Sequence, residues 1–324
     1  MGMQIFWIIL SLVWAGVSIP GIALGLDFPK REIEYYCPFG PGSNSDNFAR
    51  LGAKYGQKYI GKPIIVVNKV GGGGSRMFMA LAAAKPDGYT IGATGVGVVI
   101  QPYTLKGLTF HYKKSYRVIC QMDYSAQGLF VIKGGPFDIP LRELVKRAKE
   151  KPETIKCGIG GTWMPQDFCR EMFEQQAGVK FIKVPFPQAG EAIPALLGGH
   201  VDISFAPASE WAHLYRGGKV NVLAVSTEQR DHRFPNIPTF REFGYDITIN
   251  VIHVISAPAG TPDPIINFLA EVFRKASSDP GFVEAADQLG ATAAWKSPED
   301  SLKALDEYDE IVGRVLKKYG LTPQ

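Results

Sequence analysis

The sequence predicts an α/β fold arranged in two lobes. Three observations support this prediction: short apolar runs alternate with helical patterns in two successive sets, Gly- and Pro-rich turns separate them, and a helical tail follows a late β-rich run. Such alternation is typical of βαβ units and a mainly parallel sheet. A chain of 324 residues, 46% of them hydrophobic, is long enough for two domains with separate cores.

The first set of elements begins after residue 31. Residues 32–38 (EIEYYCP), 63–68 (PIIVVN) and 90–94 (TIGAT) are β-branched or apolar runs bounded by turn residues, so they are predicted to be strands. Residues 46–59 and 75–84 (SRMFMALAAA) have helical spacing and good helix formers, so they are predicted to be helices.

The same rhythm then starts again, without a sequence repeat that can be recognised. Apolar runs predict strands and periodic segments predict helices. The expected strands are residues 129–133, 154–159, 180–184, 201–206 and 220–226, and the expected helices are 141–150, 166–177 and 191–197.

The last third of the chain should complete the first lobe. Residues 228–238 are charged and contain proline, which indicates a surface loop, and a long β-rich run follows at 247–258. Helices are predicted at 264–276, 281–288 and 298–319, with a short strand at 291–295. These helices need a sheet to cover, and the first set of strands is the natural one.

The chain would therefore leave the first lobe near residues 116–122 and return near 247–255. Two crossings make a hinge, with a cleft between the lobes. The expected domains are residues 26–122 plus 250–324 for lobe 1 and 123–249 for lobe 2, after a leader at 1–25.

The leader has the features of a secretory signal peptide. Residues 1–26 contain no charged side chain, residues 5–17 are almost wholly apolar, and Ala23-Leu24-Gly25 has the small-x-small form of a cleavage site. An uncleaved membrane anchor is the alternative, since the apolar stretch approaches the roughly 20 residues that span a bilayer. Either reading predicts an exported, periplasmic protein.

Composition excludes several functions. A formal net charge of +4, with basic residues spread along the chain, argues against a nucleic-acid surface. The five histidines are scattered singly, so no metal site is expected. The four cysteines permit disulfides in an oxidising compartment, although free buried cysteine is also common, and the sequence leaves this open. They are Cys37, Cys120, Cys157 and Cys169.

Four turns follow predicted strands, where ligands collect in parallel sheets. FGPGSNSD at 39–46 lacks the Gly-Lys-Ser/Thr of a phosphate loop, and the chain has no G-x-S-x-G nucleophile turn. The glycine run at 71–74 lacks dinucleotide-binding spacing. At the third turn (94–97), the Thr94 hydroxyl is expected to face the cleft. In GIGGTWMPQ (158–166), Thr162 is expected to cap the next helix.

The first and fourth of these turns open helices in different lobes. Exposed N–H groups at a helix start form an anion site. Two such starts facing one another could clamp an acid without any buried Lys or Arg. Trp163, in the fourth turn, is predicted to be either a pocket wall or a core aromatic.

Several stretches together resemble a known family. KPDGYTIGA (85–93), GKPIIVVNKVGGGG (61–74), ALLGGHVDISF (195–205) and APAGTP (257–262) resemble the periplasmic solute-binding proteins of tripartite tricarboxylate transporters, also called the Bug family. FGPGSNSD falls where that family has a PFxPGGxxD turn. The resemblance covers residues 32–321.

The resemblance implies a two-lobed periplasmic binding protein fold (type II-like), with two hinge crossovers and no cofactor. It implies a monomer that binds a small organic acid and delivers it to a permease of one large and one small subunit. Carried onto this chain, the family's ligand-contacting loops are Phe39, Gly40, Ser43, Asn44 and Asp46, then Thr94 and Gly95, then Gly161, Thr162 and Trp163.

The chain departs from the family pattern at several points. Ser43 replaces a glycine, Gln101-Pro102 replaces Asn-Pro, and Trp163 with Met164 interrupts a run of small residues. Ala206 stands in the ligand-site position where the family often has Asp. The bulky Trp163 and the loss of that Asp indicate a flatter or more apolar acid.

Two other functions remain open. The same fold and pocket could serve a sensor that presents its bound acid to a membrane receptor kinase. An exported α/β enzyme acting on an acid is the other alternative, although the sequence shows no nucleophile–base pair, metal spacing or nucleotide motif. The absence of a catalytic constellation favours a binding protein.

Overall fold

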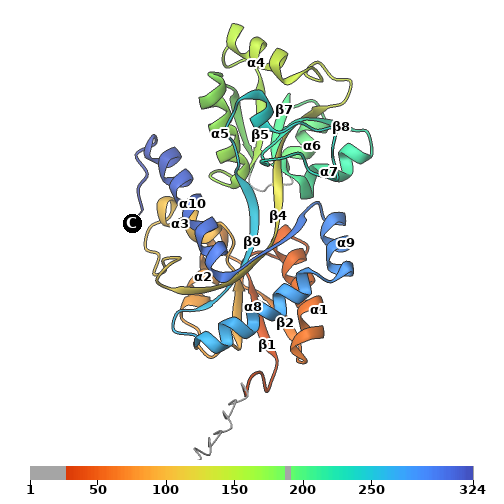
Figure 1. Ribbon diagram of the computed structural model, residues 1–324. Helices are drawn as coiled ribbons and strands as arrows, with labels where there is room; N and C mark the ends of the chain where they lie inside the picture. The colour runs from red at the N-terminus through yellow and green to blue at the C-terminus, as the bar shows by residue number, and fades with distance from the viewer. Residues whose placement is uncertain (1–26, 187–190, 324) are drawn as a thin grey trace, which may run out of the picture.

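The computed structural model describes residues 27–186 and 191–323. The leader at 1–25 therefore lies outside the described residues. Figure 1 shows two parts of the molecule joined by long strands, which we call the first and second lobes. The chain builds most of the first lobe, then the second, and returns to finish the first.

The first lobe contains the elements that the chain forms at its beginning and end. Its first part comprises β1 (Ile33–Cys37), α1 (Asn44–Ile60), β2 (Ile64–Asn68), a 3-10 turn (Gly72–Gly74), α2 (Ser75–Ala82), β3 (Thr90–Ala93) and α3 (Gly97–Thr104). The returning part comprises β9 (Asn250–Pro258), α8 (Asp263–Ser277), α9 (Pro280–Gln288), β10 (Thr292–Lys296) and α10 (Pro298–Lys317).

The second lobe contains the middle of the chain. Its elements are the last part of β4 (Tyr116–Ile132), α4 (Leu141–Glu150), β5 (Lys156–Gly160), α5 (Pro165–Ala177), β6 (Ile182–Phe186), α6 (Ala192–Leu197), β7 (Ile203–Pro207), α7 (Ala208–Arg216), β8 (Val220–Val225) and a 3-10 turn (Phe240–Phe243).

Strand pairing makes the two lobes alike. The strands run β2-β1-β3-β9-β4-β7-β5-β6, and β8 and β10 both pair with β4. In the first lobe β2-β1-β3 are parallel and β9 is antiparallel to β3. In the second, β6-β5-β7 are parallel and β4 is antiparallel to β7. This repeated order is an internal structural repeat that the sequence alone did not reveal.

The two predicted crossings between the lobes are made by the strands β4 and β9. β4 is one continuous strand of 17 residues, where the sequence predicted a crossing and a separate strand at 129–133. Over Tyr116–Ala126 it pairs with β9, and from Gln127 onward it pairs with β7 and β8 (Figure 1). The predicted break was wrong because polar residues interrupt the apolar pattern inside this strand. They are Gln121, Asp123, Ser125 and Gln127, all of them buried.

Most other predicted elements are confirmed to within a few residues, and the tail helices cover the first lobe as expected. Two helices were missed. α3 contains Pro102, which argues against a helix in sequence, and α7 follows β7 directly without a side-chain N-cap.

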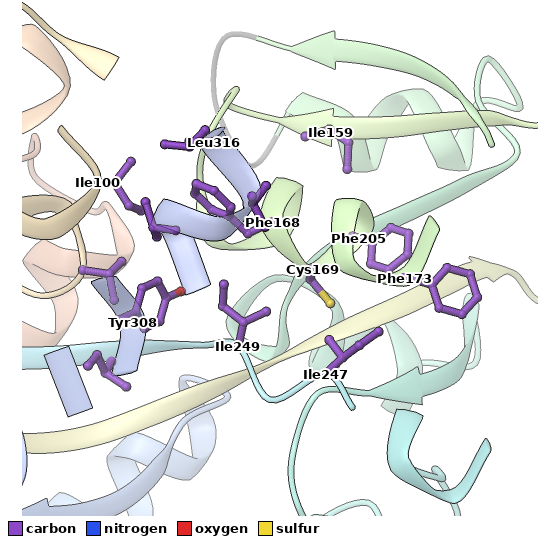
Figure 2. Packing of buried hydrophobic residues seen from close by; sticks show 14 of the residues in the cluster. Ile100, Ile159, Phe168, Cys169, Phe173, Phe205, Ile247, Ile249, Tyr308 and Leu316 are labelled. Atoms are coloured by element: carbon purple, nitrogen blue, oxygen red, sulfur yellow. The ribbon is translucent and has the colours of Figure 1, made fainter. Parts of the chain in front are cut away.

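Three hydrophobic clusters hold the layers together. α1, α8 and α9 cover one face of the first sheet, and α6 and α7 pack on one face of the second. The third cluster runs through both lobes and joins α3 and α10 to α5 (Figure 2). In it Ile100, Tyr308 and Leu316 of the first lobe lie in one apolar layer with Phe168 and Phe173 of the second.

All four cysteines are free and buried, which answers the question left open by the sequence. Burial raises the pKa of each thiol, so none has the character of a reactive thiolate. Between residues 27 and 323, in the part described, no helix combines the length and apolar character needed to cross a bilayer.

Candidate ligand-binding site

The turn between β1 and α1 presents free backbone amides. Ser43 is the N-cap of α1: its side chain accepts a hydrogen bond from the Asp46 amide at 3.2 Å. Gly42 has φ = +81°, a conformation that favours glycine. The amides of Asn44 and Ser45, the first two residues of the helix, have no acceptor among the described residues. They are therefore available to a ligand.

The buried side chain of Asp46 stabilises this turn by hydrogen bonds. Its carboxylate is buried and accepts hydrogen bonds from the Gly42 amide (2.9 Å), Asn68 Nδ2 (2.7 Å) and Arg50 Nε (2.9 Å). Burial alone would raise the pKa of Asp46, but the bonds from Arg50, Asn68 and Gly42 hold it below its usual value. Both Asp46 oxygens are thus engaged in shaping the turn, and its expected contact with the ligand stays a prediction.

Phe39 and Gly40 complete the first turn. The Phe39 carbonyl accepts from Asn68 Nδ2 at 2.7 Å, and the Gly40 carbonyl accepts from the Ser43 amide at 3.1 Å. A Cβ added at Gly40 would meet no atom within 4 Å, so the space beside this backbone is open. Phe39, Gly40, Ser43 and Asn44 thus lie in one turn, as the sequence predicted.

The turn between β5 and α5 is the counterpart in the second lobe. Here Asp167 takes the position of Asp46: it is the third residue of its helix, it is buried, and it accepts from the amide four residues earlier, that of Trp163, at 3.0 Å. Arg170 and Lys183 neutralise its charge. The two lobes therefore use the same device to shape equivalent turns.

The helix start in this second turn is uncapped. Thr162 was expected to cap α5, but it is exposed and lies outside the helix, and the N-cap is Met164, which makes no side-chain cap bond. The prediction was wrong because Gly161 and Trp163 both take positive φ, +79° and +58°, which lengthens the turn. The amides of Thr162, Met164 and Gln166 have no acceptor among the described residues.

Trp163 is only partly buried and packs against the core, which supports the core-aromatic alternative, while its role as a pocket wall stays a prediction. Its ring packs edge-on to Tyr319 at 4.9 Å between centroids and tilts against Phe168 at 6.0 Å. Lys183 Nζ lies 5.3 Å from the ring centroid. A bulky residue at positive φ is strained, and such strain persists where the surroundings fix it, often at functional sites.

The third predicted turn contributes differently from what was expected. Thr94 is buried, and its hydroxyl shares a hydrogen bond with Ser256 Oγ at 2.8 Å, so it faces the sheet rather than a cleft. The Thr94 amide donates to the Val254 carbonyl, and a Cβ at Gly95 would lie 3.0 Å from the Ile252 oxygen. This turn therefore lies against residues 252–254 of β9.

Ala206 is also a core residue. It is buried in the cluster beneath α7, and its carbonyl accepts from Trp211 Nε1 at 3.1 Å. The small side chain at this position fits the close packing of α7, and the expected ligand contact of Ala206 stays a prediction.

The sequence analysis missed His253. This residue lies on β9, and its ring stacks on Phe48 of α1, with 4.2 Å between ring centroids. Its Nε2 lies 3.3 Å from Asn44 Nδ2, and its Nδ1 contacts Asp123 Oδ1. No local signal could have found it, because its partners lie 209 and 130 positions away in sequence.

The chemistry of these turns suits an anion. Each lobe offers a helix start with free N–H groups, and the positive end of each helix dipole adds to their attraction for a negative charge. Among the residues described, no group of three or more His, Cys, Asp or Glu could hold a metal ion.

The repeated β-α units and the paired turns define a two-lobed solute-binding protein. The chain belongs to the tripartite tricarboxylate transporter receptor family, whose model matches residues 48–321. A curated relative, the "UPF0065 protein in gbd 5'region" of Cupriavidus necator, is 29% identical over 320 residues, covering 95% of this chain and 96% of its own.

Solved structures share the fold. A TctC solute-binding protein from Polaromonas has a TM-score of 0.78 at 27% identity, covering 90% of this chain and 99% of its own. The periplasmic binding protein BugD has a TM-score of 0.76 at 26% identity, covering 92% of this chain and all of its own. MatC from Rhodopseudomonas palustris, solved with bound malate, shares the fold at 24% identity and a TM-score of 0.73, covering 88% of this chain and all of its own.

Proposed function

We propose that this protein is an exported periplasmic binding protein that captures a small organic carboxylate between its lobes. It delivers the acid to a membrane permease of the tripartite tricarboxylate type, made of one large and one small subunit, and acts as a monomer without turning the acid over. The leader at 1–25 directs its export. Lobe 1 comprises residues 26–122 plus 250–324 and lobe 2 residues 123–249, and the ligand contacts are Phe39, Gly40, Ser43 and Asn44 with Gly95 and Gly161–Trp163.

One observation carries this proposal. The amides of Asn44 and Ser45 in one lobe, and of Thr162, Met164 and Gln166 in the other, have no acceptor among the described residues. Hydrogen bonds to a charged acceptor contribute about 1.5–3 kcal/mol each. Three or four of them suffice for micromolar binding, which needs about 8 kcal/mol.

The first test is a ligand panel. The chain from residue 26 onward, purified and freed of bound ligand, would be melted with mono-, di- and tricarboxylates, aromatic acids, a nucleotide and a sugar. An acid that binds should stabilise the fold by about 2.7 kcal/mol at 100 times its Kd, with no product formed. Stabilisation by the nucleotide or sugar but by no acid would refute the proposal.

A matched pair of variants tests the amides themselves. Asn44 is the first residue of α1, where proline is well tolerated, and Ser43 before it already has extended backbone (ψ = 161°). Asn44→Pro removes the side chain and the N–H, whereas Asn44→Ala removes the side chain alone. We expect Asn44→Pro to bind the acid about tenfold or more weakly than Asn44→Ala does. Equal affinities would show that this amide does not contact the ligand.

A further inference from the structure

A chain of three side chains connects the strands between the lobes to the first turn. Asp123 lies on β4 directly across the ladder from His253 on β9. The His253 ring contacts Asp123 through Nδ1 and Asn44 through Nε2, the latter at 3.3 Å. None of the four turns predicted from the sequence includes Asp123 or His253.

The contacts of the His253 ring favour one arrangement of its hydrogen. An ionised carboxylate is an acceptor with no hydrogen to donate, so the contact with Asp123 places a hydrogen on His253 Nδ1. With one hydrogen on the ring, at Nδ1, Nε2 is an acceptor, and its contact with Asn44 Nδ2 fits a hydrogen bond donated by the Asn44 side-chain amide. Asp123 is 1% exposed, so it needs this donor and favours the arrangement.

The His253 ring is fixed by packing as well as by its polar contacts. Phe48, four residues beyond Asn44 on α1, stacks on it with 19° between the ring planes. The same helix turn thus supplies both a packing partner and a hydrogen-bond partner. With the ring fixed, the orientation of the Asn44 amide follows from the state of Nε2.

We propose that Asp123 and His253 are positioning residues that turn the Asn44 side chain so that its Oδ1 is presented to the ligand as an acceptor. Oδ1 has no partner among the described residues, and Asn44 lies at the helix start that offers the free amides. An acceptor beside amide donors suits an acid that carries a hydroxyl group next to its carboxylate. The inference rests on the proposed function and narrows its substrate class to hydroxy acids.

The physical reason for selectivity is the asymmetry of hydrogen bonding. A site built to accept a hydrogen from the ligand leaves its acceptor unpaired when the hydroxyl is missing, and this is penalised more than a missing methylene. Malate and succinate differ by this one group, as do 2-hydroxyglutarate and glutarate. We expect the hydroxy acid of at least one pair to bind about tenfold more tightly.

Two variants test the Asp123–His253–Asn44 contacts through a ratio of dissociation constants, so absolute affinity is not needed. Asn44→Leu cannot accept a hydrogen bond, and His253→Gln leaves Asn44 in place but frees its amide to turn. In both, the ratio of the two dissociation constants within a pair should fall from about ten to about one. His232→Gln, at a histidine whose side chain is 71% exposed, should leave the ratio unchanged. A ratio near one in the native chain, or a ratio unaffected by either variant, overturns the proposal.

Nitrogen NMR of the ligand-free protein decides the positioning role independently. We expect the His253 signals to show hydrogen on Nδ1 and none on Nε2, with Nε2 shifted by the Asn44 amide bond. Hydrogen on Nε2 would overturn the positioning step even if hydroxy acids bind. If no acid of the panel binds, the proposed function and its hydroxy-acid class both fail, whereas binding of acids without hydroxyl preference leaves the function standing and removes this inference.

Discussion

At the scale of single residues, the two turns of the candidate site are shaped by buried acids. Asp46 and Asp167 are the third residues of equivalent helices, and each accepts from the backbone amide four residues earlier. By engaging the Gly42 and Trp163 amides, they decide which of the remaining amides stay free. The acids therefore set the backbone conformation of both turns.

Glu210 is a partly buried acid of a different kind. It lies in the first turn of α7, where a helix dipole favours a negative charge, yet burial raises its pKa from 4.5 to about 7 and its Oε2 has no partner among the described residues. Because the folded chain holds this proton more tightly than the unfolded chain does, the stabilising contribution is full below pH 4.5. It is lost as pH rises through about 7.

Glu210→Gln should therefore stabilise the protein at alkaline pH. We expect the free energy of unfolding to rise by about 1–3 kcal/mol at pH 8, and the gain to shrink as pH falls toward 5. Urea unfolding of the variant and the native chain at both pH values measures it. Glu228→Gln, at a side chain that is 73% exposed, is the control and should change stability at neither pH. An equal gain at pH 5 and pH 8 would contradict the assignment of the burial effect to Glu210.

At the scale of elements, the two helix starts differ in their caps. α1 has the Ser43 side chain on the Asp46 amide, whereas α5 begins at Met164 without a side-chain cap. A missing side-chain cap lowers the stability of a helix by about 1 kcal/mol. It also leaves backbone amides free for a ligand, so stability is lost where binding can gain.

Met164→Ser should restore the cap at the expense of binding. Met164 already has the extended backbone of an N-cap residue, with φ = −95° and ψ = 167°. A serine hydroxyl there would accept from the free Gln166 amide, raising the free energy of unfolding by about 1 kcal/mol. The same bond removes one ligand donor, so affinity for the acid should fall about tenfold. Met164→Ala, which cannot cap, is the control, and a stabilised variant with unchanged affinity would exclude the Gln166 amide from the site.

The elements also show what the sequence could predict. Strands, most helices and the Ser43 cap follow from local patterns, because period, turn residues and capping are local physics. The misses have non-local causes. β4 looked broken because buried polar side chains inside it find partners in other parts of the chain, such as the Gly290 carbonyl for Ser125 Oγ and His253 for Asp123. Asp46 was expected to contact the ligand from the family's motif alone, and the hydrogen bonds that occupy its carboxylate come from the folded turn, α1 and β2. His253 could not be predicted from the sequence because its partners, Asn44 and Asp123, lie far from it along the chain.

At the scale of the whole molecule, the lobes are joined by more than their two connecting strands. The cluster of Figure 2 packs α10 and α3 of the first lobe against α5 of the second. Beyond the end of α10, Tyr319 reaches Trp163 in the second-lobe turn. The chain end thus contacts the candidate site of the opposite lobe, and this side of the molecule is tied together by side-chain packing.

A shared cluster should make the lobes unfold together. Leu316 on α10 is fully buried in it, so Leu316→Ala should cost about 2–5 kcal/mol and lower the melting temperature in one cooperative transition. Calorimetry checks that the measured and van't Hoff enthalpies agree, and hydrogen exchange should show protection lost in α5 as well as in α10 and α3. Leu197→Ala, at a side chain that is 40% exposed, should change stability by no more than about 0.5 kcal/mol. If α5 keeps its protection while α10 exchanges, the lobes are independent cooperative units and the cluster contributes little to their coupling.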